Sequence, residues 1–477
     1  MKRRVSQPDH DGGSFRDPAG FIFMHRGAVY RQINRSGQAD YDFFIKSGLY
    51  GKLAGEGLLV AHEDIKSLND IPSDEQRYKL IRPAPIPFIS YPYEWTFSQL
   101  KDAALLTLQI QRTALSFGMI LKDASAYNVQ FIGRRPVFID SLSFRIYKAG
   151  APWDGYKQFC EHFVAPLALA VYSSPDILKT LRAYIDGMPL LAVRDLLPTR
   201  AKLHKGLLAH IYLHAASQKR YDRVEPGAAA KQPKISRLAL EGLISSLTKT
   251  VNRLDLPKQK TEWGDYYNDT NYSQSALTAK KKIVKKYLEK ISPKPKIVWD
   301  LGANDGTFSE IAAGLGSYVV ASDVDSLAVE LNYTKNRSLV LRDMILPIIQ
   351  DLANPSPALG WAHAERRSFE QRGPADAVMA LALIHHLAIS NTLPFNKIAE
   401  YFAQLGKYLI IEFIPKSDSK IQILLHRRVN MFEDYTQENF EAAFGIYFTT
   451  VAREPVRGSK RVIYLFKVKP TKIAHDK

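Results

Sequence analysis

The fold of the second half of this 477-residue chain is decided by the stretch Lys296-Ile-Val-Trp-Asp-Leu-Gly-Ala-Asn-Asp-Gly-Thr-Phe-Ser-Glu310. An apolar run enters a glycine-bearing turn, and a segment compatible with a helix follows it. Such a turn needs glycine because a side chain would block a ligand and because one position usually adopts a positive φ. The stretch therefore predicts a buried strand, a ligand-binding turn over Gly302–Gly306 and then a helix.

Short apolar runs alternate with helical segments on both sides of this stretch, which is typical of a parallel sheet covered on both faces. The expected strands span 297–300, 318–322, 346–352, 377–382 and 408–412, and a terminal antiparallel hairpin is expected from 444–452 and 461–468. Dinucleotide-dependent dehydrogenases generally lack a reversed terminal pair. We therefore expect an α/β domain with a Rossmann-like, seven-stranded sheet.

Two acidic residues end strands where a nucleotide-like ligand would need them. Asp300 ends the first strand as an acceptor for an ammonium group, and Asp323 ends the next strand. A carboxylate there can accept both ribose hydroxyls, by the logic that places an acid about 20 residues past a dinucleotide-binding loop. The loop itself has the spacing Gly302-x-x-x-Gly306 with Asn304 in the middle, which differs from Gly-x-Gly-x-x-Gly and disfavours a dinucleotide.

The strand, turn, spaced acid and terminal hairpin together resemble the class I S-adenosylmethionine-dependent methyltransferase family, whose members have the added reversed strand. The resemblance implies that Asp300 approaches the amino-acid end of the cofactor, that Asp323 holds the ribose and that Asp351 contacts the adenine. Asn304 departs from the glycine that many members have at its position. The implied S-adenosylmethionine site consists of Asp300, Gly302, Ala303, Asn304, Gly306, Asp323 and Asp351.

Candidate catalytic residues follow the fourth and fifth expected strands. The segment Ala380-Leu-Ala-Leu-Ile-His385-His386 stands at the carboxyl end of a strand, where this fold binds the methyl acceptor. A histidine there can take a proton from a hydroxyl nucleophile because histidine titrates near neutral pH. The alternative is that one histidine packs on the adenine and the other on a helix. Glu412, at the end of the fifth strand, is a second candidate base.

The N-terminal half carries a different constellation, Leu121-Lys-Asp123-Ala-Ser-Ala-Tyr-Asn128, followed by Asp140 after an apolar strand. This spacing resembles kinase-like phosphotransferases, which implies that Asp123 orients an acceptor hydroxyl and that Asn128 and Asp140 hold magnesium with ATP. That family's glycine-rich loop is absent, and Arg31 replaces the usual strand lysine. Three interpretations stay open: a degenerate kinase-like module, an active but divergent phosphotransferase, or a coincidence of short motifs.

The chain divides into three parts by pattern. We expect an α+β domain over 14–220, a linker and helix over 221–260, and the methyltransferase-like domain over 261–470. In the first domain, a helix is predicted over 96–120 with Thr96 as its N-cap, and short strands are predicted around turns at 26–27 and 133. The aromatic stretch 263–272 is interpreted either as a lid over the cofactor site or as ordinary packing.

Composition places the chain among globular proteins, with 46% hydrophobic and 24% charged residues. Its single cysteine, Cys160, excludes an internal disulfide framework and favours a reducing compartment. The basic start lacks a following apolar stretch, and no run reaches the roughly 18 apolar residues that cross a bilayer. We therefore expect neither a signal peptide nor a transmembrane segment, and a cytoplasmic location.

The formal net charge of +17 indicates an anionic partner, which could be nucleic acid, a membrane surface or an anionic small molecule. Part of this charge belongs to the helical run 276–290, whose lysines we expect mostly to coat the outside of a helix. Aromatic residues are not interleaved with this run, which argues against a single-strand stacking platform. The favoured partner is an anionic or glycan-type acceptor, and peripheral membrane contact stays open.

Across nearly its full length the sequence also resembles the nodulation-protein NoeA-like group of predicted methyltransferases. That resemblance is carried by Ser47–Tyr50, Tyr93–Trp95, Leu121–Asn128, Asn304–Gly306, Asn354–Trp361 and Ala380–His386. It implies modification of a glycan or glycolipid precursor at the cytoplasmic face, with O-methylation as the expected reaction. The alternatives are an RNA or protein methyltransferase and a non-catalytic binding module with a relic cofactor site, because fold and family do not fix the acceptor.

Overall fold

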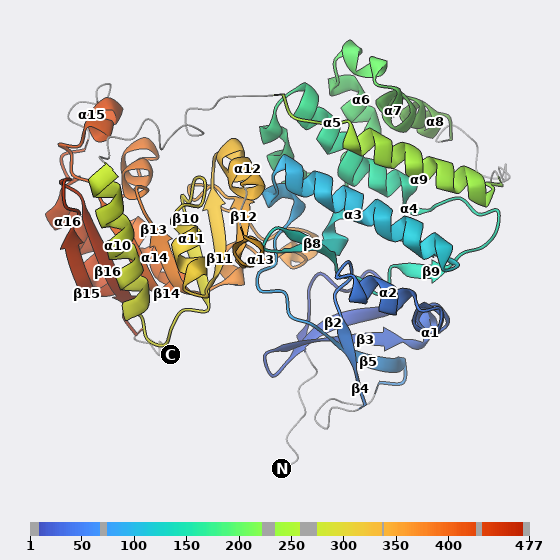
Figure 1. The fold of residues 1–477 in the computed structure, drawn as a ribbon, viewed down its shortest axis with the longest axis horizontal. Helices are drawn as coiled ribbons and strands as arrows, with labels where there is room; N and C mark the ends of the chain where they lie inside the picture. The colour runs from blue at the N-terminus through green and yellow to red at the C-terminus, as the bar shows by residue number, and fades with distance from the viewer. Residues whose placement is uncertain are drawn as a thin grey trace. The chain divides into compact units, whose positions relative to one another are not determined.

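The computed structural model describes residues 9–66, 74–221, 234–257, 274–335, 338–425 and 432–470. The chain forms two compact units (Figure 1). Unit 1 comprises Met1–Gln259 together with Ala358–Arg366, and unit 2 comprises Lys260–Pro357 and Arg367–Lys477. A short segment from between two strands of unit 2 thus belongs to unit 1 by its contacts, which the sequence did not indicate.

Unit 1 begins with a five-stranded antiparallel sheet in the order β1-β2-β3-β5-β4. The turn between β2 and β3 contains Arg26 and Gly27, both with positive φ, and it confirms the predicted hairpin. Helices α1 (Gln38–Lys46) and α2 (Leu49–Gly55) connect β3 to β4. The strands are β1 Asp9–His10, β2 Gly20–His25, β3 Ala28–Asn34, β4 His62–Ile65 and β5 Arg77–Pro83.

The rest of unit 1 is mainly helical. Helix α3 (Phe97–Ser116) starts where predicted, because the Thr96 hydroxyl accepts a hydrogen bond from the N–H of Gln99. It ends earlier than predicted because Gly118, with a φ of 77°, turns the chain into the next strand. Two short strand pairs follow, β6 (Met119–Leu121) with β9 (Phe144–Ile146), and β7 (Val129–Ile132) with β8 (Arg135–Phe138) around Gly133 as predicted.

Beyond β9, unit 1 continues as α4 Gly155–Phe159, α5 Ala165–Tyr172, α6 Leu190–Leu196, α7 Lys205–Leu207, α8 His214–Tyr221 and α9 Arg237–Asn252. Helix α9 confirms the helix expected before the second domain, and it packs against α3. The unit is therefore an α+β arrangement, with strands first and helices after them.

Unit 2 contains the predicted seven-stranded α/β sheet, in the order β12-β11-β10-β13-β14-β16-β15. The five strands from β12 to β14 are parallel, and β16 runs antiparallel to β14 and β15. This order, with its reversed terminal pair, confirms the class I methyltransferase arrangement. The strands are β10 Ile297–Leu301, β11 Tyr318–Asp323, β12 Ile345–Ile349, β13 Ala375–Ala380, β14 Gly406–Phe413, β15 Phe448–Pro455 and β16 Val462–Val468.

The helices of unit 2 are α10 Gln274–Lys290, α11 Ser309–Gly314, α12 Ser326–Thr334, α13 Leu339–Met344, α14 Phe395–Leu405, α15 Ser419–Leu425 and α16 Gln437–Tyr447. The strand predicted over 444–452 was wrong at its start, because residues 444–447 belong to α16. Phe440 and Phe444 lie one helical turn apart and are both buried in an aromatic cluster, and this packing favours the helix.

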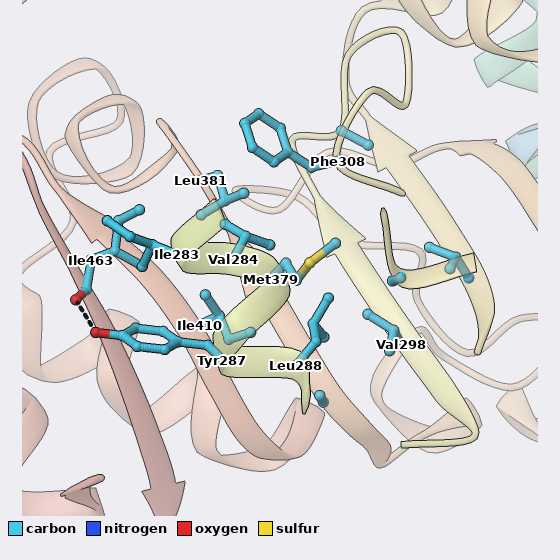
Figure 2. Packing of buried hydrophobic residues seen from close by; sticks show 14 of the residues in the cluster. Ile283, Val284, Tyr287, Leu288, Val298, Phe308, Met379, Leu381, Ile410 and Ile463 are labelled. Carbon is cyan, nitrogen blue, oxygen red and sulfur yellow. Dashed lines mark hydrogen bonds between the residues drawn. The ribbon is translucent and has the colours of Figure 1, made fainter. Parts of the chain in front are cut away.

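Helix α10 packs on one face of the sheet (Figure 2). Its buried residues include Val284 and Tyr287, and the Tyr287 hydroxyl donates to the carbonyl of Ile463 at 3.3 Å. The expectation that the lysines of this helix coat its outside was wrong for Lys280, which is 3% exposed. Lys280 lies four residues after Ala276 and four before Val284, so helical periodicity places it on the buried face.

Candidate functional site

A pocket of about 350 Å³ lies where the parallel strands of unit 2 end. Its wall is formed by the segments that follow β10, β11, β12 and β13, which is the place where open α/β sheets bind ligands. All of the predicted cofactor residues except Gly306 line it: Asp300, Gly302, Ala303, Asn304, Asp323 and Asp351. Six of the seven residues predicted from the sequence therefore lie together around one cavity.

The loop after β10 is held in shape by positive φ angles and by β11. Gly302, Asn304 and Gly306 have φ values of 74°, 50° and 78°. Asparagine is among the few residues other than glycine that adopt this conformation readily, which explains why it fits this slot. The N–H groups of Gly302 and Ala303 both donate to the carbonyl of Ser322, at 2.8 and 2.9 Å. The loop backbone is thereby fixed before any ligand binds.

Asp323 is fixed by backbone donors. Its Oδ2 accepts the N–H of Asn304 at 2.9 Å, its Oδ1 accepts the N–H of Asp325 at 3.1 Å, and the N–H of Val324 also bonds this carboxylate. Burial raises the pKa of Asp323, and these backbone bonds oppose that effect. A carboxylate has about four lone-pair sites, so part of its acceptor capacity remains for ligand hydroxyls.

Asp300 is the most deeply buried acid of the pocket, at 2% exposed. Burial raises its pKa to about 7, whereas the Ser309 hydroxyl, which donates to Oδ2 at 2.6 Å, and the Lys280 ammonium act in the opposite direction. A ligand ammonium near this group would favour the ionised form. The geometry therefore fits the amino-acid end of S-adenosylmethionine.

Glu412 does not line the pocket but supports it. Its Oε2 accepts both the Nζ of Lys280, at 2.7 Å, and the N–H of Ala382, at 2.8 Å, and the side chain is fully buried. Lys280 and Ala382 are pocket residues, and Ala382 has a positive φ of 54°. A second cation, Arg461, places its Nη1 3.8 Å from Oε1 of Glu412. These contacts favour a positioning role for Glu412 over the predicted role as a base.

The two candidate histidines occupy different environments. His386, at the start of the π-helical turn η10 (His386–Ser390), lines the pocket, while His385 is 4% exposed and does not. Their rings are in contact at a tilt of 42°, with centroids 4.0 Å apart, and burial lowers the pKa of both. Nδ1 of His385 has no hydrogen-bond partner among the described residues. His386 is thus held neutral at the cavity, in the form that can accept a proton.

Sequence reasoning missed several pocket residues. Lys280 was hidden in a lysine-rich run, although its four-residue spacing from Ala276 and Val284 was a usable signal. Gln350 was also missed: the third parallel strand ends at Ile349, short of the predicted 352, and the chain turns so that Gln350 and Asp351 both line the pocket. The proposed aromatic lid over 263–272 lies outside the described residues.

The acidic residues of unit 1 are engaged by the protein itself. Arg31 forms an ion pair with Oδ1 of Asp140, and the Ser143 hydroxyl donates to Oδ2 at 2.5 Å. Although burial opposes its ionisation, the Arg31 charge and the Ser143 hydroxyl hold the pKa of Asp140 below its ordinary value. Asn128 donates from Nδ2 to the Ser143 hydroxyl at 3.2 Å. The residue in place of the usual strand lysine therefore neutralises the predicted metal ligand.

This arrangement does not fit the magnesium and ATP that the kinase-like resemblance implies. Burial raises the pKa of Asp123, whose Oδ1 accepts the N–H of Ser125 at 2.9 Å. Among the described residues, no group of three or more His, Cys, Asp or Glu side chains could hold a metal ion. The roles predicted for Asp123, Asn128 and Asp140 therefore gain no support from the contacts that surround them.

In the part of the chain that the structure describes, no helix is long and apolar enough to span a bilayer.

A comparison with known proteins relates the chain to nodulation protein NoeA of Rhizobium meliloti (strain 1021). The two sequences are 34% identical over 468 residues, which cover 97% of this chain and 96% of that protein. No family model matches the sequence. The similarity therefore extends over both units, including the unit that precedes the methyltransferase fold.

Similar solved structures each cover less than half of the chain. Magnesium protoporphyrin IX methyltransferase ChlM from Synechocystis PCC 6803, with bound SAH, is 18% identical over 43% of this chain and 93% of its own, with a TM-score of 0.31. N-methyltransferase NodS from Bradyrhizobium japonicum WM9 is 12% identical over 42% of this chain and 99% of its own, with a TM-score of 0.29. The bifunctional kinase-methyltransferase WbdD is 13% identical over 43% of this chain and 41% of its own, with a TM-score of 0.28. TM-scores this low carry no argument about the fold, so the fold of unit 2 is assigned from its sheet order.

Proposed function

The chain belongs to the family of nodulation protein NoeA and is an S-adenosylmethionine-dependent methyltransferase, and from this premise we propose that it methylates a hydroxyl of a glycan, glycolipid or small-molecule acceptor. The observation that carries the proposal is the pocket itself, in which a fixed loop, three aspartates and a neutral histidine surround one cavity. The net charge of +17 favours an anionic acceptor, and the resemblance to the NoeA-like group implies one of glycan type.

S-adenosylmethionine supplies a methyl group activated by a sulfonium, which leaves as a neutral thioether. The protein has to hold that group in line with the acceptor and exclude water. We assign Asp300 to the ammonium, Asp323 to the ribose hydroxyls and Asp351 to the adenine. His386 lines the same pocket and is neutral, so it can accept the proton that the acceptor hydroxyl loses when its oxygen bonds to the methyl carbon.

Unit 1 is proposed to be a degenerate kinase-like module that serves in binding rather than in phosphoryl transfer. The Arg31–Asp140 ion pair supports this, because a guanidinium occupies the carboxylate that a magnesium ion would need. A cytoplasmic location is part of the same proposal. It is supported by the single, buried Cys160, which forms no disulfide, and by the requirement for S-adenosylmethionine.

A labelled-methyl transfer assay on fractionated cell extract tests the acceptor class. The full-length protein is incubated with each fraction and methyl-labelled S-adenosylmethionine, and the Gly302→Arg variant is the negative control. Label in carbohydrate or glycolipid, retained after conditions that remove esters, supports O-methylation of a glycan. Label confined to RNA or protein would replace this acceptor with the alternative one. Binding of S-adenosylmethionine without labelling of any fraction would instead favour a binding module with a relic site.

A further inference from the structure

A second cavity, of about 380 Å³, lies within unit 1. One wall is a single face of helix α9, whose lining residues recur every three or four positions from Gly242 to Arg253. The facing wall is the turn at His204–Gly206, where α7 begins. None of these residues belongs to the methyltransferase pocket or to the kinase-like constellation, so this cavity has no role in the function proposed above.

The described residues that line this cavity carry positive charge. Lys205, Lys249 and Arg253 lie at its exposed rim, and within the described residues their side chains form no hydrogen bond or ion pair. No Asp or Glu is among the described residues that line the cavity, and the acids nearest in sequence are engaged elsewhere: Glu241 pairs with Arg237, and Asp255 with Lys101. Like charges gathered in one cavity repel each other, so a bound anion would relieve that repulsion.

His204 shapes the turn on one side of this cavity. Its Nδ1 accepts the N–H of Leu207 at 3.3 Å, so in the neutral ring the hydrogen is on Nε2. That Nε2 has no partner among the described residues and is closed to solvent, so it offers no contact to a ligand in the cavity. The donors that face the cavity are therefore the basic side chains.

The walls of the cavity are held in place by specific contacts. The Ser246 hydroxyl is hydrogen-bonded to Nε2 of His210 at 2.9 Å, and Nδ1 of His210 is bonded to the Tyr156 hydroxyl at 2.9 Å. A Cβ atom at Gly206 would lie 2.0 Å from the Thr250 hydroxyl oxygen, so glycine alone allows the turn to approach α9 this closely. The donors of the turn and of the helix are thereby held near one another.

We propose that this cavity binds a phosphate or diphosphate group of a phosphorylated ligand. Phosphate oxygens are pure acceptors, and they match the guanidinium of Arg253 and the ammonium groups of Lys205 and Lys249. The volume is at the lower end of the range of roughly 300–1,000 Å³ for small-molecule sites, which suits a diphosphate with part of its attached group. The proposal does not depend on methyl transfer.

Titration of the full-length protein with inorganic pyrophosphate at fixed ionic strength tests this site. We expect saturable binding to one site, weakened at least tenfold in the double variant Lys249→Ala/Arg253→Ala. The matched control is Lys282→Ala/Lys285→Ala, which removes two exposed positive charges from α10 and leaves pyrophosphate affinity unchanged. Thermal unfolding of each variant checks that unit 1 stays folded, and S-adenosylmethionine titration checks unit 2, so loss of the anion site is distinguishable from unfolding and from loss of the methyltransferase pocket.

Two further arms identify the source of the phosphate. Binding to phosphatidylcholine vesicles that contain phosphatidic acid, abolished by pyrophosphate and by the α9 double variant, assigns a lipid headgroup. Pyrophosphate binding without vesicle binding assigns a soluble phosphate ester, and both results support the site. The proposal is overturned if neither probe binds saturably, if sulfate at equal ionic strength competes as well as pyrophosphate, or if the α10 control loses as much affinity as the α9 variant.

Discussion

The candidate site acids of unit 2 and of unit 1 were predicted from equally short sequence patterns, yet their surroundings in the structure differ. Asp300 and Asp323 accept hydrogen bonds from a hydroxyl and from backbone N–H groups, and they line a cavity. Asp140 is instead bonded to the guanidinium of Arg31 and to the Ser143 hydroxyl. Spacing places carboxylates at strand ends, but the neighbouring cations decide whether acceptor capacity remains for a ligand.

Replacing Gly302 by arginine has the largest expected effect. The position has a φ of 74°, so any side chain there is strained, and a Cβ atom would already contact Leu383 at 3.4 Å. A long side chain from this point enters the cofactor pocket, and we expect methyl transfer to fall to background in the labelled assay. Gly445→Arg is the matched control, because Gly445 is exposed in α16 and nothing lies near its Cβ position. Equal activity in Gly302→Arg would show that the cofactor binds elsewhere.

Lys280→Met tests the support of the pocket. It leaves the buried Glu412 with the N–H of Ala382 and, among the described cations, the more distant Arg461, and loss of one partner of a buried pair typically costs about 3–5 kcal/mol. We expect the midpoint of urea unfolding of unit 2 to fall accordingly. Lys286→Met, which breaks the exposed pair with Glu454 on the same helix, should cost less than about 1 kcal/mol. Similar losses in the two variants would mean that Lys280 is not a buried support.

The pKa of Asp300 predicts a pH dependence of cofactor affinity. Because burial raises this pKa to about 7 in the free protein, the carboxyl becomes protonated as the pH falls through 7. The ligand ammonium favours the ionised form, so affinity for S-adenosylmethionine should fall by up to about tenfold per pH unit below that point. Calorimetric titrations between pH 5.5 and 7.5, with Asp300→Asn as a comparison that lacks this titration, would reveal the slope. An affinity of the native protein that does not change with pH would show that Asp300 does not bind the ammonium group.

The smallest effect is expected in unit 1. Asp140→Ala should leave both S-adenosylmethionine affinity and methyl transfer unchanged, because Asp140 does not line the cofactor pocket and is paired with Arg31 in place of a metal ion. We also expect titration of the native protein with ATP and magnesium to give no saturable signal. Tight binding of magnesium and ATP that disappears in Asp140→Ala would overturn the degenerate-module proposal and make unit 1 a phosphotransferase.

The sequence predicted the sheet of unit 2 well because alternation of strands and helices is a local pattern. The turn after β10 and the carboxylate at the end of β11 were also within reach, since both follow strands at fixed spacing. The terminal hairpin was predicted but its first strand was set too early, because Phe444 has the same apolar character in a helix as in a strand.

The remaining parts of the site depend on contacts between residues far apart in the chain. The Lys280–Glu412 pair joins residues separated by 132 positions, so helical spacing can place Lys280 on the buried face but cannot identify its partner. Arg31 and Asp140 are a second such pair, 109 positions apart. The membership of Ala358–Arg366 in unit 1 is a tertiary property of the same kind.

The central claim, that the loop after β10 and the acid at the end of β11 hold S-adenosylmethionine, is tested most directly by calorimetric titration of the native protein and the Asp323→Ala variant. Two hydrogen bonds from ribose hydroxyls to a charged acceptor contribute about 1.5–3 kcal/mol each. The native protein should bind one cofactor per chain, and Asp323→Ala should weaken the affinity at least a hundredfold. Binding of equal affinity in the two proteins, or no binding to the native one, would contradict the assignment.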